Sequence, residues 1–169
     1  LFAKANLTEL FMVSLVQVYI NKCIMEDRDP KKLFPAPPFN TPEQDYPGTE
    51  KKMEPKADHG EDTYVGYGRF IDKKVIITGG DSGIGKAVAI AFAREGADVM
   101  ISYLADDEDK DAQDTVKYIE AAGRKAVVMK GDITSETHCE AIIAKAVAEF
   151  GHIDVLVNNA AFHISRKQI

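Results

Sequence analysis

The sequence predicts an α/β protein built on a doubly wound parallel sheet, and two observations carry this prediction. From about residue 73 onward, short aliphatic runs alternate regularly with segments of helical periodicity. A glycine follows each helical segment, and glycine favours the left-handed conformation that ends a helix. Strands and helices that alternate in this way are joined by right-handed crossovers, which place parallel strands in one sheet with helices on both faces.

The predicted elements follow one another without long gaps. The first strand, residues 75–77, is apolar at every position, as expected for a strand covered on both faces. A glycine-rich turn then leads into a helix over residues 86–95. The later elements are a strand at 99–103, a helix at 111–122, a strand at 126–129, a helix capped by Thr134 or Ser135 and running to residue 150, and a strand at 153–157. We therefore expect a sheet truncated after its fourth strand.

Composition excludes several classes of partner and ligand. The 169 residues include 21 basic and 27 acidic ones, a net charge of −6, and no basic run suggests nucleic acid or an anionic membrane as a partner. Cys23 and Cys139 lack ligand spacing, which argues against zinc and disulfides and favours the cytoplasm. We expect no metal site, an acidic run at 106–111 that forms a solvated helix start, and histidines that are solvated or locally bonded.

The first 72 residues differ from the rest in composition. Residues 7–20 are largely apolar but too few to span a bilayer as a helix. A signal peptide is one interpretation of residues 1–24, and the favoured one is a leader that is not natural, with Met25 as the start. Residues 25–72 contain all seven prolines, which predicts an extended arm over a domain or towards a partner subunit, with a disordered tail as the alternative.

The glycine-rich turn, Thr78 to Gly85, has the sequence TGGDSGIG between a predicted strand and a predicted helix. Gly79 would permit a tight turn, Gly83 would let the backbone approach a pyrophosphate, and Gly85 would let helix and strand pack closely. The helix N-terminus would offer unpaired N–H groups to the phosphates. The pattern predicts dinucleotide binding, and a purely structural role for the glycines is the alternative.

TGxxxGIG after a first strand resembles the cofactor signature of the short-chain dehydrogenase/reductase family. Asp132-Ile133, after the third predicted strand, matches the family's Asp-aliphatic pair, whose carboxylate contacts adenine. Residues 158–161 resemble the family's NNAG motif, with Ala161 in place of the glycine. Short motifs in the arm, such as PPF at 37–39 and GYGR at 66–69, are similar to a bacterial subgroup of general-stress and aldehyde-reductase-like members.

The resemblance implies a Rossmann fold with strand order three-two-one-four, an NAD or NADP cofactor, a small carbonyl or alcohol substrate, and a homo-oligomer, a tetramer in the family. Asn158 would stabilise the sheet, whereas Asn159 and Ala160 would line the ribose. The implied cofactor-binding residues are Gly79, Asp81, Ser82, Gly83, Ile84, Gly85, Tyr103, Asp132, Ile133, Asn159 and Ala160.

The choice between NAD and NADP depends on the end of the second strand. An acidic side chain there accepts hydrogen bonds from the ribose of NAD, and a basic one binds the phosphate of NADP. Ser102-Tyr103-Leu104 offers neither. Ser82 stands where many NADP-using relatives carry a basic residue, and acidic residues follow from Asp106, so the sequence leans slightly to NAD.

The family's reaction needs a tyrosine with a lysine four residues later, and a serine, all beyond the NNAG motif. None of the six tyrosines in this sequence has that lysine. We therefore predict no catalytic residue here, and we expect an inactive, cofactor-binding part of an NAD(P)-dependent oxidoreductase. A non-catalytic nucleotide-binding module is the alternative. An isomerase or epimerase of the extended relatives is disfavoured because those show TGxxGxxG.

Overall fold

The computed structural model of the chain describes residues 35–40 and 50–161. Backbone contacts divide the chain into two units, Leu1–Thr41 and Pro42–Ile169, and all the helices and strands below belong to the second. The leader predicted at residues 1–24 lies outside the described residues, as does His163.

A parallel sheet forms the centre of the second unit. It contains β1 (Lys74–Thr78), β2 (Asp98–Tyr103), β3 (Ala126–Lys130) and β4 (Val155–Val157) in the order β3-β2-β1-β4. β1 is central, and its Ile76 pairs with Met100 on one side and with Leu156 on the other. The predicted fold class and strand order are both confirmed.

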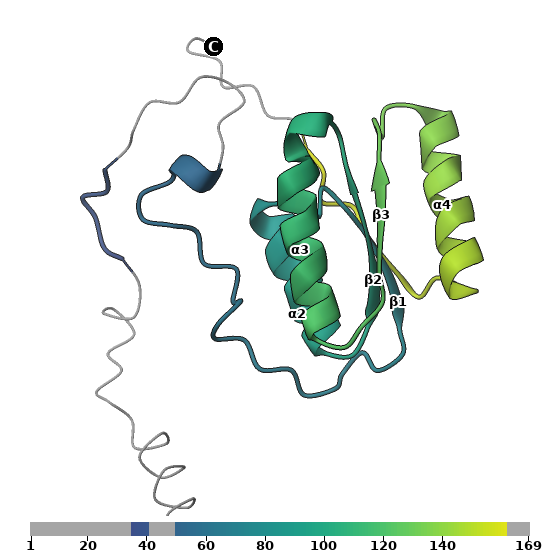
Figure 1. Cartoon of the computed structure of the whole chain (residues 1–169), viewed down its shortest axis with the longest axis horizontal. Coiled ribbons are helices and arrows are strands. Elements are labelled where there is room, and N and C mark those ends of the chain that lie inside the picture. The colour runs from purple at the N-terminus through teal and green to yellow at the C-terminus, as the bar shows by residue number, and fades with distance from the viewer. Residues whose placement is uncertain (1–34, 41–49, 162–169) are drawn as a thin grey trace, which may run out of the picture. The chain divides into compact units, whose positions relative to one another are not determined.

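Helices cover both faces of this sheet (Figure 1). α2 (Gly83–Arg94) and α3 (Asp109–Ala121) lie on one face, and α4 (Glu136–Phe150) lies on the other. Val75 and Ile77 pack in the core beneath α2 and α3, whereas Ile76 belongs to the core beneath α4. Because successive strand side chains point to opposite faces, an uninterrupted apolar run is what β1 needs to fill both cores.

The helices end where the glycine pattern predicted, but α2 starts at a different residue from the predicted one. Gly96, Gly123 and Gly151 follow α2, α3 and α4 with φ values of 98°, 74° and 87°. Ser135 caps α4, since its side chain accepts a hydrogen bond from the His138 N–H at 3.4 Å. α2 begins at Gly83 and not at residue 86, and the Lys86 N–H already donates to the Ser82 carbonyl oxygen at 3.1 Å, although the helix propensity of glycine is low.

Arg94, at the end of α2, binds the arm through backbone carbonyls. Its guanidinium donates to the carbonyl oxygens of Gly60 at 2.9 Å and Tyr64 at 2.5 Å, and also to that of Glu61. A side chain at Gly66 would come within 1.9 Å of the Arg94 carbonyl oxygen, so the arm backbone passes directly over the helix end.

Glu95 binds the same part of the arm through its carboxylate, which is only 2% exposed. It accepts hydrogen bonds from the Tyr67 N–H at 3.0 Å, from the Arg69 N–H and Nε at 2.9 Å each, and from the Tyr64 hydroxyl. The hydrogen bonds from Arg69 and Tyr64 hold the pKa of Glu95 far below its ordinary value. The carboxylate is therefore a charged anchor for the arm at neutral pH.

Candidate nucleotide-binding site

The carboxyl ends of all four strands meet at one edge of the sheet, where ligands bind in open parallel sheets. The predicted site residues lie in the turn after β1, at the end of β2, and in the loops after β3 and β4. The structure therefore brings together four segments that are far apart in the sequence. Hydrogen bonds join neighbouring segments: Gly80 N–H donates to the Ser102 carbonyl at 3.1 Å, and Gly131 N–H donates to the Tyr103 carbonyl at 2.9 Å.

Three glycines of the turn leave little or no room for a side chain, and at Gly80 a Cβ would lie 2.5 Å from Ile101 Cγ2. Gly79 has a φ of 63°, and a Cβ there would lie 3.1 Å from the Ala160 Cα. A Cβ on Gly85 would lie 1.8 Å from the Gly79 carbonyl oxygen, a distance that no structure tolerates. Because glycine has no side chain at these positions, the turn can pack tightly against the first turn of α2.

Gly83, in contrast, faces open space. Its φ is 52°, and no described atom outside the neighbouring residues lies within 4 Å of the position that a Cβ would take. The next residue, Ile84, is 76% exposed although it is large and apolar. Within the described residues, the side chain of the N-cap residue Ser82 makes no capping hydrogen bond. The first turn of α2 thus presents backbone N–H groups, with a partial positive charge, beside the open space at Gly83.

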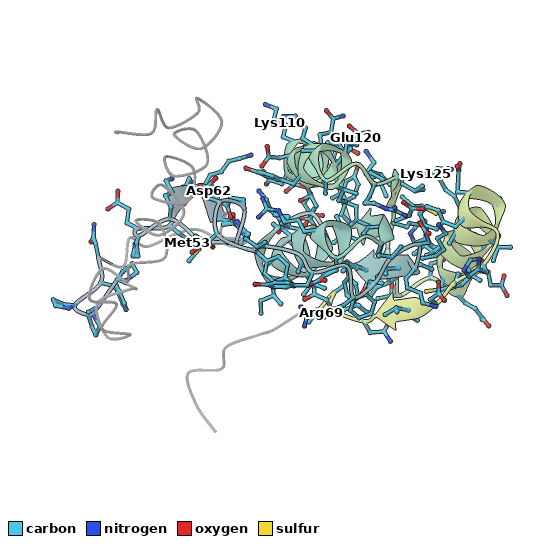
Figure 2. All side chains as sticks on the ribbon, turned by 90° about the horizontal axis from the view of Figure 1, so that it is seen from below. Met53, Asp62, Arg69, Lys110, Glu120 and Lys125 are labelled. Atoms are coloured by element: carbon cyan, nitrogen blue, oxygen red, sulfur yellow. The ribbon has the colours of Figure 1, made fainter. Side chains whose placement is uncertain are left out.

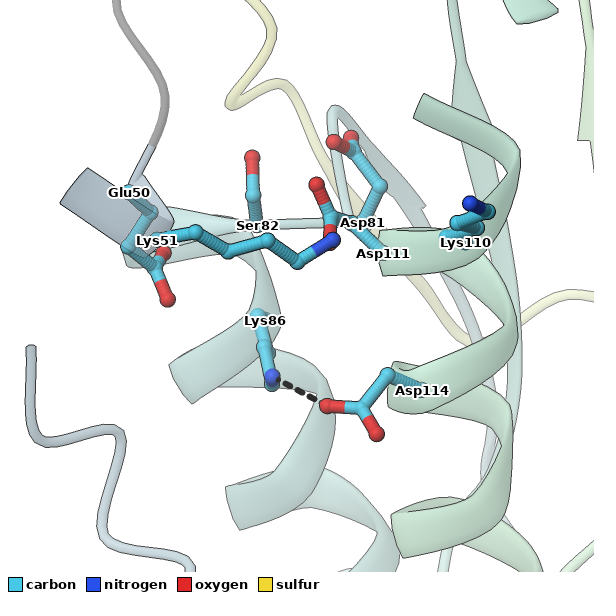
Figure 3. Close-up of a pocket in the computed structure, with 8 residues that line it drawn as sticks. All are labelled: Glu50, Lys51, Asp81, Ser82, Lys86, Lys110, Asp111 and Asp114. Carbon is cyan, nitrogen blue, oxygen red and sulfur yellow. Dashed lines mark hydrogen bonds and ion pairs between the residues drawn. The ribbon is translucent and has the colours of Figure 1, made fainter. Parts of the chain in front are cut away.

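Two residues of the 3-10 helix η2 (Glu50–Lys52) approach this turn from the arm. The Gly83 N–H donates to Glu50 Oε2 at 2.7 Å, and the His59 Nε2 lies 2.9 Å from Glu50 Oε1. Lys51 pairs with Asp111 on α3 at 2.5 Å. Between η2, α2 and α3 lies a pocket of about 290 Å³ (Figure 3). Its lining residues are Glu50, Lys51, Asp81, Ser82, Lys86, Lys110, Asp111 and Asp114.

A hydrogen bond from α3 holds the backbone of Asp81 in the turn. The hydroxyl of Thr115, a fully buried residue of α3, donates to the Asp81 carbonyl oxygen at 2.9 Å. Burial raises the pKa of the Asp81 carboxyl, and the nearby negative charges of Glu108 and Asp111 raise it further, against a hydrogen bond from Ser82. The Asp81 carboxyl thus lies in a buried position with two other carboxylates nearby.

Acidic side chains also occupy the end of β2. The Tyr103 hydroxyl donates to Asp109 at 2.7 Å, and burial together with this bond raises the pKa of Tyr103. The backbone N–H groups of Leu104 and Ala105 both donate to Glu108 Oε2, at 2.8 Å and 3.3 Å. The N–H groups that follow β2 are thus already paired with a carboxylate from the same chain.

The loop after β4 is tied to β1 by Asn159. Its side-chain amide donates to the carbonyl oxygens of Thr78 at 3.0 Å and Gly79 at 2.9 Å, and its N–H donates to the Thr78 hydroxyl at 3.1 Å. We expected Asn158 to stabilise the sheet, but these contacts belong to Asn159, and Asn158 is exposed. The prediction chose the wrong one of two adjacent asparagines, because successive residues of an extended segment face opposite ways.

Asp132, the predicted adenine contact, lies exposed in the loop after β3. Its Oδ1 accepts a hydrogen bond from the Thr134 N–H at 2.8 Å, and that bond lowers the pKa of the Asp132 carboxyl. Ile133 beside it is 38% exposed. The carboxylate thus helps to shape its own loop, and its contact with adenine stays a prediction.

Two of the three described histidines, His59 and His152, lie beside carboxylates. The side chain of His59 is 5% exposed and lies between Glu50 and Glu61, the latter at 3.5 Å. His152 lies 3.1 Å from Asp154. Among residues 35–40 and 50–161, no three His, Cys, Asp or Glu side chains group as metal ligands do. The same residues include no helix with the length and apolar character needed to cross a membrane.

Sequence reasoning missed two residues that shape this site. Glu50 lies in the proline-rich arm, where no pattern marks a contact with a residue 33 positions later. Thr115 carried a weak signal, because it is a polar residue on the face of a predicted helix that also contains Ala112 and Ile119, both buried.

A sequence model of the short chain dehydrogenase family matches residues 73–169. The chain belongs to this family. Its motifs at the ends of β1, β3 and β4 are therefore those of a short-chain dehydrogenase, as the resemblance implied.

Relatives of known sequence support the same assignment. The oxidoreductase YghA of Escherichia coli K12 is 47% identical over 129 residues, which cover 76% of this chain and 44% of YghA. General stress protein 39 of Bacillus subtilis is 44% identical over 114 residues, 68% of this chain and 39% of that protein. The chain thus spans about two fifths of these relatives. The YghA alignment is longer than residues 73–169 and so extends into the arm, in agreement with the general-stress subgroup resemblance.

Among solved structures, a short chain dehydrogenase from Burkholderia cenocepacia in complex with NADP is similar, with a TM-score of 0.53 and 37% identity. The match covers 56% of this chain and 38% of that protein. Short-chain dehydrogenases bind nicotinamide dinucleotides, and the fold that positions the site here is theirs.

Proposed function

We propose that this chain is the cofactor-binding part of an NAD(P)-dependent oxidoreductase that transfers hydride between nicotinamide and an alcohol, aldehyde or ketone. The observation that supports the proposal is the glycine-rich turn from Gly79 to Gly85, where Gly83 leaves open space in front of the first turn of α2. Family membership supports an oxidoreductase over the non-catalytic nucleotide-binding module.

The residues present fit a dinucleotide in four segments. Backbone N–H groups at Ser82, Gly83 and Ile84 would bind the pyrophosphate, and Asp132 with Ile133 would contact the adenine. Tyr103 would border the adenosine ribose, and Asn159 with Ala160 the other ribose. The bound nicotinamide would accept or supply the hydride, whereas this chain's residues bind and orient the cofactor.

NAD is the cofactor that the charges favour. A 2′-phosphate beside β2 would meet Glu108, whose carboxylate already accepts from the Leu104 and Ala105 N–H groups. It would also meet the buried Asp81, whose raised pKa reflects a site that already disfavours negative charge. The hydroxyls of an NAD ribose, in contrast, can donate to these carboxylates.

The chemical step would belong to residues outside this chain's sequence. No tyrosine here is followed by a lysine at the fourth position, so we propose that the chain by itself binds cofactor without turnover. We further propose a cytoplasmic location, since the two cysteines have no disulfide or metal spacing. A homo-oligomer is proposed from family resemblance.

Two matched variants test cofactor binding. Gly83→Val places a β-branched side chain in the open space in front of α2, at a φ of 52°. Gly123→Val is the control, because Gly123 has a φ of 74° and equally open surroundings at the far end of α3. NADH titration by fluorescence should show at least tenfold weaker binding for the first variant and no change for the second. Equal affinity in both variants would remove the turn from the proposed site.

A further inference from the structure

The helix that opens the proposed site is capped by a residue from the arm. Ser82 occupies the N-cap position, and serine is among the residues that most readily cap a helix. Within the described residues its hydroxyl does not do so, and Gly83 N–H instead donates to Glu50, 33 residues earlier in the chain. The helix N-terminus therefore holds a carboxylate that is not local to it.

The position of Glu50 is fixed by the fold of the arm. Arg94 and Glu95 anchor residues 60–69 at the far end of α2. From there the chain leads back to His59, which is buried and 2.9 Å from Glu50 Oε1. The other oxygen, Oε2, is thereby directed at Gly83, 2.7 Å away. The arm thus reaches both ends of α2, and its acidic group lies at the end that would receive the cofactor.

In the proposed function, a cofactor phosphate would bind where the Glu50 carboxylate now lies. A carboxylate oxygen and a phosphate oxygen use the same donor, a backbone N–H at a helix N-terminus, and two anions repel one another there. Gly83 has one N–H, and the space in front of it is otherwise open. Glu50 and a dinucleotide pyrophosphate therefore exclude each other at this position.

We propose that Glu50 competes with the cofactor pyrophosphate for the Gly83 N–H, an inference that rests on the proposed function. Cofactor binding then requires the segment of the arm that contains Glu50 to move away from α2. Glu50 is about three-quarters shielded, with its side chain 24% exposed, and must be resolvated when displaced. The cofactor's apparent affinity is then its intrinsic affinity multiplied by the fraction of molecules in which Glu50 is displaced from α2.

The test compares four forms of the full chain by NADH fluorescence titration: wild type, Glu50→Gln, Glu50→Asp and Glu120→Gln. Replacing a charged acceptor by a neutral amide oxygen weakens a hydrogen bond by roughly 1 kcal/mol or more, which changes an equilibrium constant up to about tenfold. Glu50→Gln should therefore bind NADH up to about tenfold more tightly than wild type. Glu50→Asp keeps the charge but is one methylene too short for the contact, so it should also bind more tightly. Glu120, on the outer face of α3 (Figure 2), controls for net charge.

The outcomes separate this proposal from the proposed function. If Glu50→Asp binds NADH like wild type while Glu50→Gln binds more tightly, the affinity change comes from general charge repulsion. The proposed contact between Glu50 and Gly83 is then refuted. If all forms bind NADH equally, the competitor is refuted and the cofactor site stands. If none binds, the proposed function fails and the competition fails with it.

A second measurement needs no cofactor. Hydrogen exchange of the Gly83 amide, followed by NMR, should be faster in Glu50→Gln than in wild type, because the acceptor is weakened. An unchanged exchange rate would show that Glu50 does not occupy Gly83 in solution and would overturn the proposal.

Discussion

The hydrogen bond from Thr115 to the turn lends itself to a quantitative prediction. Thr115 is fully buried on α3, and its hydroxyl is 2.9 Å from the Asp81 carbonyl oxygen. Thr115→Val keeps the shape of the side chain and removes the donor. Thr115→Ser keeps the donor and removes a methyl group. The pair therefore separates the hydrogen bond from the packing.

The two variants should lose similar amounts of unfolding free energy, but for different reasons. Thr115→Val leaves a buried carbonyl without its donor, which costs about 1–3 kcal/mol of unfolding free energy. Thr115→Ser loses one buried methyl group, which costs about 1 kcal/mol. At about 4 °C per kcal/mol, the first variant should melt about 4–12 °C below wild type and the second about 4 °C below.

Cofactor binding distinguishes the two variants. Without its hydroxyl donor, the turn at Asp81 is no longer held against α3, so NADH affinity should fall severalfold in Thr115→Val. Thr115→Ser retains the bond and should bind NADH like wild type. Thermal melting and NADH titration on the same samples give both quantities. Equal NADH affinities for the two variants would refute the reasoning, because the hydroxyl would then have no part in positioning the turn.

Two further predictions concern charge. Glu108→Gln should raise the affinity for NADPH relative to NADH severalfold, measured by parallel titrations with Glu120→Gln as the control; an unchanged ratio would contradict the proposed preference for NAD. Hydrogen bonds from Arg69 and Tyr64 depress the pKa of Glu95, so its stabilisation of the fold is fully present above its ordinary pKa of 4.5 and is lost as pH falls below it. The difference in melting temperature between wild type and Glu95→Gln should therefore shrink between pH 6 and pH 3, and a constant difference would argue against a charged Glu95.

The elements that the sequence predicted correctly are those with a local signal. β1 is apolar throughout because both of its faces are covered, and the helices end at glycines because the backbone there is left-handed. The glycines of the turn follow the same logic, since Gly85 has no space for a side chain. Periodicity and steric exclusion restrict which residue types occur at single positions, so these features can be predicted from the sequence alone.

Two things could not be predicted from the sequence. One is which residues of a strand face which side of the sheet, and the other is a contact between distant segments. Val155 and Val157 pack against the α2 side of the sheet, and two residues further Asn159 continues on that side. Because β4 is apolar at each of its positions, no alternation shows which asparagine faces β1. Glu50 is a harder case, since only the folded arm brings it to Gly83.

The anchoring of the arm has a practical consequence for defining the domain. The family match begins at residue 73, and a protein expressed from that boundary would contain all four described strands together with α2, α3 and α4. It would also contain Glu95 without the Tyr64 and Tyr67 groups that donate hydrogen bonds to it and without Arg69, its ion-pair partner. A charge would then be left at the end of α2 with its partners deleted. In this chain the compact unit begins at Pro42, upstream of residue 73, so truncations of this chain should keep the arm residues that contact Glu95.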